Sequence, residues 1–156
     1  MKECYADICD DTEVDEVISK GIDIICNNPD SIEPFKNADK DHIKYFLKSV
    51  VKGEQEDYFL VVFKDLKDHH LVGTCLFSSG SPWYNPNIIA VNEECTVAFE
   101  KGYGIARAVA EELEFLLTIG FDIVQASSAN ECVAKLIENT YNKYGFKQYK
   151  TYYKTK

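Results

Sequence analysis

The chain has 156 residues, of which 46% are hydrophobic and 28% are charged, and its formal net charge is −9. This length and composition predict one globular domain over residues 1–156 with a core of its own. No cluster of lysine or arginine supplies the basic face that a nucleic-acid backbone requires, so we expect no nucleic-acid partner. The acidity is compatible with a cationic substrate and equally with plain solubility.

Membrane and metal partners are also not expected. No apolar run approaches the length of a membrane span, and residues 1–4 lack the apolar core of a signal peptide. We therefore expect an intracellular, cytoplasmic protein. The cysteines form no CxxC pair, which favours buried free thiols over disulfides or zinc, and only three histidines are present. The cysteines are Cys4, Cys9, Cys26, Cys75, Cys95 and Cys132.

The first half of the chain predicts one strand, two helices and a hairpin. Residues 3–9 alternate well enough for a strand. Apolar stripes predict helices at 12–26 and 39–52, and the proline-containing segment between them is expected to be a loop. The β-formers at 58–63 and 71–77 predict a hairpin, followed by a loop that is rich in serine and proline.

The second half alternates strands with helices. A long strand at 88–99, expected to be interrupted by its polar centre, leads into a helix from Ile105, and a strand at 121–126 follows. The capping box at 128–131 opens a further helix, and the tail at 147–155 is expected to be a last strand. The order β-α-α-β-β-β-α-β-α-β predicts an α/β domain with a mixed sheet and helices on both faces.

The stretch from Thr96 to Arg107 predicts a strand, a glycine-bearing turn and a helix. Gly102 and Gly104 can adopt backbone angles closed to other residues and leave room for a ligand beside the main chain. A helix N-terminus after such a turn offers N–H groups and a partial positive charge, which both suit a phosphate. Neither a dinucleotide fingerprint nor a Walker loop is present, so the turn by itself leaves a plain connection and a phosphate cradle equally open.

Two motifs in this context resemble those of the GNAT superfamily of acyl-CoA N-acyltransferases. Lys101-Gly102-Tyr103-Gly104-Ile105-Ala106 is similar to the family's pyrophosphate loop, with Lys101 in place of Arg or Gln. Tyr141-Asn142-Lys143-Tyr144-Gly145-Phe146 is similar to the family's Tyr-x-Lys-x-Gly-Phe. Asn130 resembles an Asn of the family but lies farther before Tyr141 than is usual. The resemblance spans roughly residues 57–150 and implies a single domain with a mixed, mostly antiparallel central sheet.

The resemblance implies an N-acetyltransferase that uses acetyl-CoA as co-substrate and a primary amine as acceptor. It implies that N–H groups of the loop hold the pyrophosphate, and that the pantetheine arm pairs with the strand before the loop around Val97 and Phe99. Arg107 is either a further phosphate contact or a solvated helix residue. The implied contacts to the co-substrate are Val97, Phe99, Lys101, Gly102, Tyr103, Gly104, Ile105, Ala106, Arg107 and Asn130.

Three residues are candidates for the chemistry. The resemblance implies that Tyr141 is the general acid, and the alternative is an aromatic core residue. Glu94 is the first candidate for the base and Glu93 the second, because carboxylates in an apolar strand require a reason. Adjacent strand residues face opposite ways, so we expect Glu94 on the face of Thr96 and Glu93 on the face of Cys95. The alternative is that both carboxylates face solvent.

Other functions stay open at this point. A GNAT-like module without turnover, acting as a CoA-binding or protein-interaction domain, is the main alternative, and the negative charge disfavours a transferase acting on charged tRNA. A homodimer is compatible with the sequence. His69 and His70 are expected at the surface near the hairpin turn. Residues expected near the acceptor are Glu33, Asp41, Trp83, Tyr84, Tyr152 and Tyr153.

Overall fold

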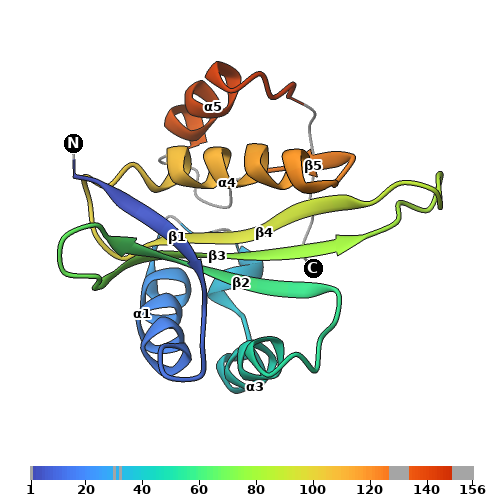
Figure 1. Cartoon of the computed structure of the whole chain (residues 1–156). Coiled ribbons are helices and arrows are strands. Elements are labelled where there is room, and N and C mark those ends of the chain that lie inside the picture. Colours follow the sequence, from blue (N-terminus) through green and yellow to red (C-terminus); the bar gives the residue numbers. More distant parts are fainter. Residues whose placement is uncertain (1, 30, 32, 127–133, 149–156) are drawn as a thin grey trace.

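The computed structural model describes residues 2–29, 31, 33–126 and 134–148, and these form a single curved sheet covered by helices (Figure 1). The sheet has the strand order β1-β2-β3-β4-β5. Strands β1 to β4 pair antiparallel, and β5 pairs parallel to β4. The expected mixed, mostly antiparallel sheet is therefore confirmed. The strands are β1 (Cys4–Ile8), β2 (Tyr58–Asp65), β3 (Leu71–Gly80), β4 (Ala90–Ala98) and β5 (Ile123–Gln125).

The helices divide between the two faces of the sheet. Figure 1 shows α1 and α3 on one face and α4 and α5 on the other, as expected. Each face has its own core, and the adjacent residues Val62 and Phe63 of β2 are both fully buried, one in each core. The central strands are therefore apolar on both faces. The helices are α1 (Val14–Asn27), α2 (Glu33–Lys36), α3 (Lys40–Val51), α4 (Ile105–Ile119) and α5 (Ala134–Lys143).

Several sequence-based boundaries were wrong, or lie outside the described residues. The expected loop between α1 and α3 contains the short helix α2, and β3 continues through the serine-rich stretch to Gly80. The capping box at 128–131 and most of the expected last strand lie outside the described residues. The described cysteines are free thiols, and Cys9 and Cys75 are buried among apolar side chains.

β4 is bulged at its polar centre, and the expected interruption is absent. Leu76 of β3 lies opposite Cys95, but the next residue, Phe77, lies opposite Glu93. Glu94 is thus the extra residue of a β-bulge. Side chains normally alternate between the two faces of a sheet. Beyond a bulge, each side chain points to the face opposite the one that strict alternation along the strand would give. Consequently Glu93 shares a face with Thr96, which corrects the facing expected from the sequence.

Gly73 of β3 lies where the sheet meets the start of α4. A Cβ atom built on Gly73 would lie 2.9 Å from Ile105 Cδ1 and 3.0 Å from the carbonyl oxygen of Val97. We expect Gly73→Ala to lower the free energy of unfolding by about 1–3 kcal/mol, the usual cost of overpacking. Urea unfolding measures this loss. Gly80→Ala is the matched control in the same strand, because a Cβ there meets nothing within 4 Å. Equal stability of both variants would contradict the prediction.

Candidate active site

The loop between β4 and α4 has the backbone shape of an anion cradle. Gly102 has φ +94° and Gly104 has φ +64°, both in the left-handed region that favours glycine. No described residue accepts a hydrogen bond from the N–H groups of residues 101–106, and the next one, Arg107 N, donates to Gly104 O at 2.8 Å. A run of N–H groups at a helix N-terminus is the arrangement that binds phosphate.

The side chains of the cradle divide into exposed and buried ones. Lys101 is exposed, whereas Tyr103 and Ile105 are 2% and 5% exposed and belong to the core. Arg107 is half-exposed, with Nε 3.5 Å from Glu111 Oε1, and this buried Nε has no hydrogen-bond partner among the described residues. The backbone of this loop, with the charges of Lys101 and Arg107, is therefore what a ligand can contact.

β4 has an open edge on the side away from β3. β5 pairs with β4 only over Ala90–Asn92. Phe99 N donates to Val72 O at 2.9 Å, so the backbone groups of Phe99, and of Val97 two residues earlier, face β3. The backbone groups that face the open edge are those of Thr96 and Ala98. The backbone groups of Val97 and Phe99, which were expected to meet the pantetheine arm, therefore face β3 and not the open edge.

Tyr141 and Glu93 meet where β5 leaves β4. The Tyr141 hydroxyl donates to Glu93 Oε2 at 2.9 Å, and Thr96 Oγ1 donates to Glu93 Oε1 at 2.5 Å. Tyr141 and Glu93 are 8% and 6% exposed. Burial, and next the negative charge of Glu93, raise the pKa of the Tyr141 hydroxyl well above its ordinary value. The phenol therefore keeps its proton at neutral pH.

The end of α5 fixes the Tyr141 ring. Gly145 has φ +79° and closes the helix, and Phe146 N donates to Tyr141 O at 3.1 Å. This turn brings the Phe146 ring to 5.2 Å from the Tyr141 ring, between ring centroids. Tyr144 OH donates to Glu111 Oε1 of α4 at 2.8 Å and ties the two helices together. The motif from Tyr141 to Phe146 therefore fixes the position of the Tyr141 ring through contacts within the motif itself.

Glu94 lies on the opposite face of the sheet from Glu93. Its carboxylate accepts a hydrogen bond from Ser78 Oγ. Ser78 pairs with Tyr58, whose ring packs in the core beneath α1 and α3, and cross-strand partners share a face. Asn92 Nδ2 lies 3.5 Å from Ser78 Oγ on the same face. Glu94 is exposed, so it is the carboxylate that a solvent-borne amine can reach.

The other predicted residues are either exposed elsewhere on the chain or outside the described residues. Asn130, Tyr152 and Tyr153 are outside the described residues. Trp83 is 95% exposed, and Tyr84 is also exposed, in the loop between β3 and β4. Glu33 and Asp41 are exposed, on α2 and α3 respectively.

His69 and His70 lie at the β2–β3 turn, as expected. His70 lies between Asp68 and Glu100, and these two carboxylates raise its pKa, Asp68 the more. Ligand atoms of Asp65, Asp68 and His70 come within 4.8 Å of one another. Each of the three already accepts or donates hydrogen bonds within the protein. His69 Nδ1 forms a hydrogen bond with the Tyr5 hydroxyl.

Two partners of the carboxylates could not be found from the sequence. Ser78 was expected in a loop, and Thr96 was expected to share a face with Glu94. The facing of Thr96 was wrong because an extra residue in β4 leaves no mark in the hydrophobic pattern, and Ser78 was missed because the serine-rich end of β3 resembles a loop. The only sequence signal is the polar pair Glu93-Glu94 in an otherwise apolar strand, and this pair alone does not distinguish a bulge from a break in the strand.

Comparison with known proteins shows the fold. The sequence matches no protein-family model and no curated protein. A GNAT family acetyltransferase of Staphylococcus aureus has 14% identity and a TM-score of 0.62, with 100% of this chain and 99% of that chain covered. A predicted acetyltransferase of Clostridium acetobutylicum, solved with acetyl-CoA, has 14% identity and a TM-score of 0.65, with 98% and 96% covered.

A third similar structure is an aminoglycoside acetyltransferase from an uncultured soil metagenomic sample, in complex with sisomicin. It has 13% identity and a TM-score of 0.60, with 97% of this chain and 95% of that chain covered. The chain therefore has the fold of the GNAT acetyltransferases. In the part of the chain that the structure describes, no helix has both the length and the apolar character needed to cross a bilayer.

Proposed function

We propose that the protein is an N-acetyltransferase that transfers the acetyl group of acetyl-CoA to a primary amine. The observation that carries the proposal is the position of Tyr141, whose buried hydroxyl lies 2.9 Å from Glu93 at the point where β5 leaves β4. A proton donor at an open strand edge is what a departing thiolate requires. The fold shared with acetyltransferases, one of them solved with acetyl-CoA, supports the same reaction.

The cradle supports acetyl-CoA as co-substrate. The N–H groups of residues 101–106 and the positive end of the α4 dipole suit a pyrophosphate. Lys101 and Arg107 add positive charge, and Arg107 Nε, in the first turn of α4, has no hydrogen-bond partner among the described residues. The open edge at Thr96 and Ala98 offers backbone groups to the amide-bearing pantetheine arm, as an added strand would use them.

The reaction assigns one task to each face of the sheet. On the α1–α3 face, Glu94 takes a proton from the acceptor ammonium, directly or through water, and the freed nitrogen attacks the thioester carbonyl. A backbone N–H of the open edge polarises that carbonyl. The nitrogen of the tetrahedral intermediate loses its second proton to water, the carbon–sulfur bond breaks, and Tyr141 on the α4–α5 face gives its proton to the thiolate. Glu94 then releases its proton to water, and Tyr141 regains one from water. The products are an N-acetylated amine and CoA.

The acceptor is a cationic amine in this proposal. Glu94 and its partners Ser78 and Asn92 form a polar, negatively charged site on an exposed face. The net charge of −9 attracts protonated amines at long range. A similar structure was solved with the aminoglycoside sisomicin, which is a chemical class compatible with this charge.

Calorimetric titration with acetyl-CoA and CoA tests the cradle. We expect the wild-type protein to bind both ligands, and Gly104→Glu to weaken binding by about two orders of magnitude or more, because a carboxylate would meet the pyrophosphate. Gly53→Glu is the matched control. Gly53 also has a positive φ, +75°, and lies in the turn after α3, away from the cradle. The control variant should bind like the wild type.

The outcomes separate the proposal from its alternative. Absence of binding by the wild-type protein would refute acetyl-CoA as co-substrate. Binding without turnover of any amine, with CoA affinity unchanged in Tyr141→Phe, would instead favour a CoA-binding or interaction module. Equal loss of binding in both glutamate variants would show that backbone strain, and not the cradle, explains the effect.

A further inference from the structure

Tyr103 lies at the centre of the cradle but points away from it. It stands between the two left-handed glycines, Gly102 and Gly104, and its side chain is buried beneath the loop. Its hydroxyl donates to Asp65 Oδ2 at 2.6 Å. Asp65 ends β2, 38 positions away in the sequence. This hydrogen bond thus connects the loop after β4 to the end of β2, which is separated from β4 by β3.

Asp65 is itself held in place. Its Oδ1 accepts hydrogen bonds from Lys67 N at 2.6 Å and from Asp68 N at 3.3 Å, both in the β2–β3 turn. The hydrogen bond from Tyr103, followed by that from Lys67 N, lowers the pKa of Asp65 to about 2. The carboxylate is therefore ionised at neutral pH, and its bond with Tyr103 is charge-assisted.

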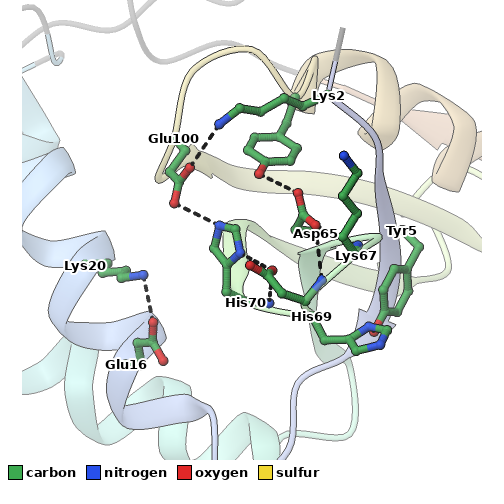
Figure 2. A network of polar contacts seen from close by, with 11 residues as sticks. Lys2, Tyr5, Glu16, Lys20, Asp65, Lys67, His69, His70 and Glu100 are labelled. Atoms are coloured by element: carbon green, nitrogen blue, oxygen red, sulfur yellow. Dashed lines mark hydrogen bonds and ion pairs between the residues drawn. The ribbon is translucent and has the colours of Figure 1, made fainter.

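A second set of contacts holds the rim of the loop. Lys2 N donates to Gly102 O at 3.2 Å, and Lys2 Nζ lies 4.9 Å from the centroid of the Tyr103 ring. Lys2 Nζ is also 3.7 Å from Glu100 Oε2, and His70 Nε2 is 3.0 Å from Glu100 Oε1. Figure 2 shows these groups converging on the loop from the N-terminal segment and from the β2–β3 turn.

We propose that the Asp65–Tyr103 hydrogen bond holds the cradle in the one backbone shape that binds a pyrophosphate. The inference rests on the proposed function, since it assumes that this loop receives the pyrophosphate of CoA. Two glycines give the loop many accessible shapes, and converging N–H groups exist in few of them. A fixed tyrosine between the glycines removes that freedom before the ligand arrives, so less ordering cost remains at binding. Tyr103 and Asp65 are thus positioning residues that act through the backbone.

Comparison of two ligands tests the inference. CoA carries the pyrophosphate, and S-acetylpantetheine carries only the arm that would lie along β4. We expect Tyr103→Phe to raise the Kd for CoA about tenfold, which corresponds to the loss of one charge-assisted hydrogen bond. The Kd for S-acetylpantetheine, measured by ligand-observed NMR, should stay within about twofold of the wild-type value, a difference of no more than about 0.4 kcal/mol.

Two further variants sharpen the result. Tyr5→Phe is the matched control, because the Tyr5 hydroxyl bonds to His69 of the same turn at 3.0 Å without contacting the loop. It should leave both Kd values unchanged. Asp65→Asn keeps the oxygen that accepts from Lys67 N and puts an amide NH2 in place of Oδ2, which can donate to the Tyr103 oxygen. A neutral hydrogen bond then replaces the charge-assisted one, so the Kd for CoA should fall between those of the wild type and Tyr103→Phe.

Each contrary result has a separate meaning. An unchanged Kd for CoA in a folded Tyr103→Phe protein overturns the inference while the proposed function stands. An equal rise for CoA and S-acetylpantetheine also overturns it, because that pattern indicates general loss of structure. If the wild type fails to bind CoA, the proposed function fails, and the inference fails with it.

Discussion

Replacing Tyr141 with phenylalanine is expected to lower kcat about 100-fold or more and to leave the Kd for CoA unchanged. General acid catalysis commonly contributes about 10²- to 10⁴-fold, and only the hydroxyl is removed. The aromatic ring and its contact with Phe146 remain, so folding and the cradle are preserved. Steady-state kinetics with a saturating amine, beside calorimetry with CoA, measure the two quantities. An unchanged kcat would show that Tyr141 is a core residue only.

The raised pKa of Tyr141 bears directly on this role. A raised pKa makes the phenol a weaker acid. The sulfur that accepts the proton, however, would lie in the same buried environment. A CoA thiolate buried beside Tyr141 and Glu93 would also be a stronger base than in water, because burial and the nearby carboxylate both disfavour its charge, and the difference between the two pKa values governs the transfer.

The pH dependence follows from the same shift. The acid must hold its proton to function, and a pKa raised above the ordinary value of about 10 keeps the proton in place at higher pH. Ionisation of Tyr141 should therefore produce no fall in kcat below about pH 10. An alkaline limb at lower pH that disappears in Tyr141→Phe would contradict this assignment.

The second large effect is expected for the two adjacent glutamates, Glu93 and Glu94. Their roles can be tested separately because the bulge places them on opposite faces of the sheet. Glu94→Gln should lower kcat/KM for the amine about 100-fold, the usual contribution of a general base. Glu93→Gln should lose much less, because Glu93 is buried beside Tyr141 and its amide replacement can still accept the phenol hydrogen bond. The two variants carry the same substitution one residue apart, so each serves as the control for the other.

The assay measures kcat/KM of both variants with one amine at one pH. Proton removal needs the Glu94 carboxylate, which an amide cannot replace, so the large loss of kcat/KM should occur in Glu94→Gln and not in Glu93→Gln. A larger loss in Glu93→Gln than in Glu94→Gln would reverse the assignment and identify the buried carboxylate as the base.

Much of the fold could be predicted because the helices and strands carry strong local patterns. The amphipathic stripes of α1 and α3 and the β-branched and aromatic runs of β2 and β3 are local signals. Helix α2 was missed because four residues with a proline carry no period. The end of β3 was missed because its serines and glycine resemble a loop, and only pairing with β4 makes them a strand.

The candidate site could be predicted only where its residues lie together in a motif. The cradle and the turn that places Tyr141 are continuous in sequence. The bond between Tyr103 and Asp65 is not, because tertiary packing alone brings the two residues together. The facing of Glu93 and Glu94 was wrong because alternation is a local rule, and the extra residue that breaks it is defined only by the partner strand.

The bulge also determines the route of hydrogen in the proposed reaction. Glu94 lies on one side of the sheet, and Tyr141 lies on the other, bonded to Glu93. In that reaction the sheet would separate the two proton transfers. The hydrogens that leave the amine would enter water on the α1–α3 side, and the hydrogen that ends on sulfur would come from the phenol on the α4–α5 side. Tyr141 would then regain its proton from water before the next turnover.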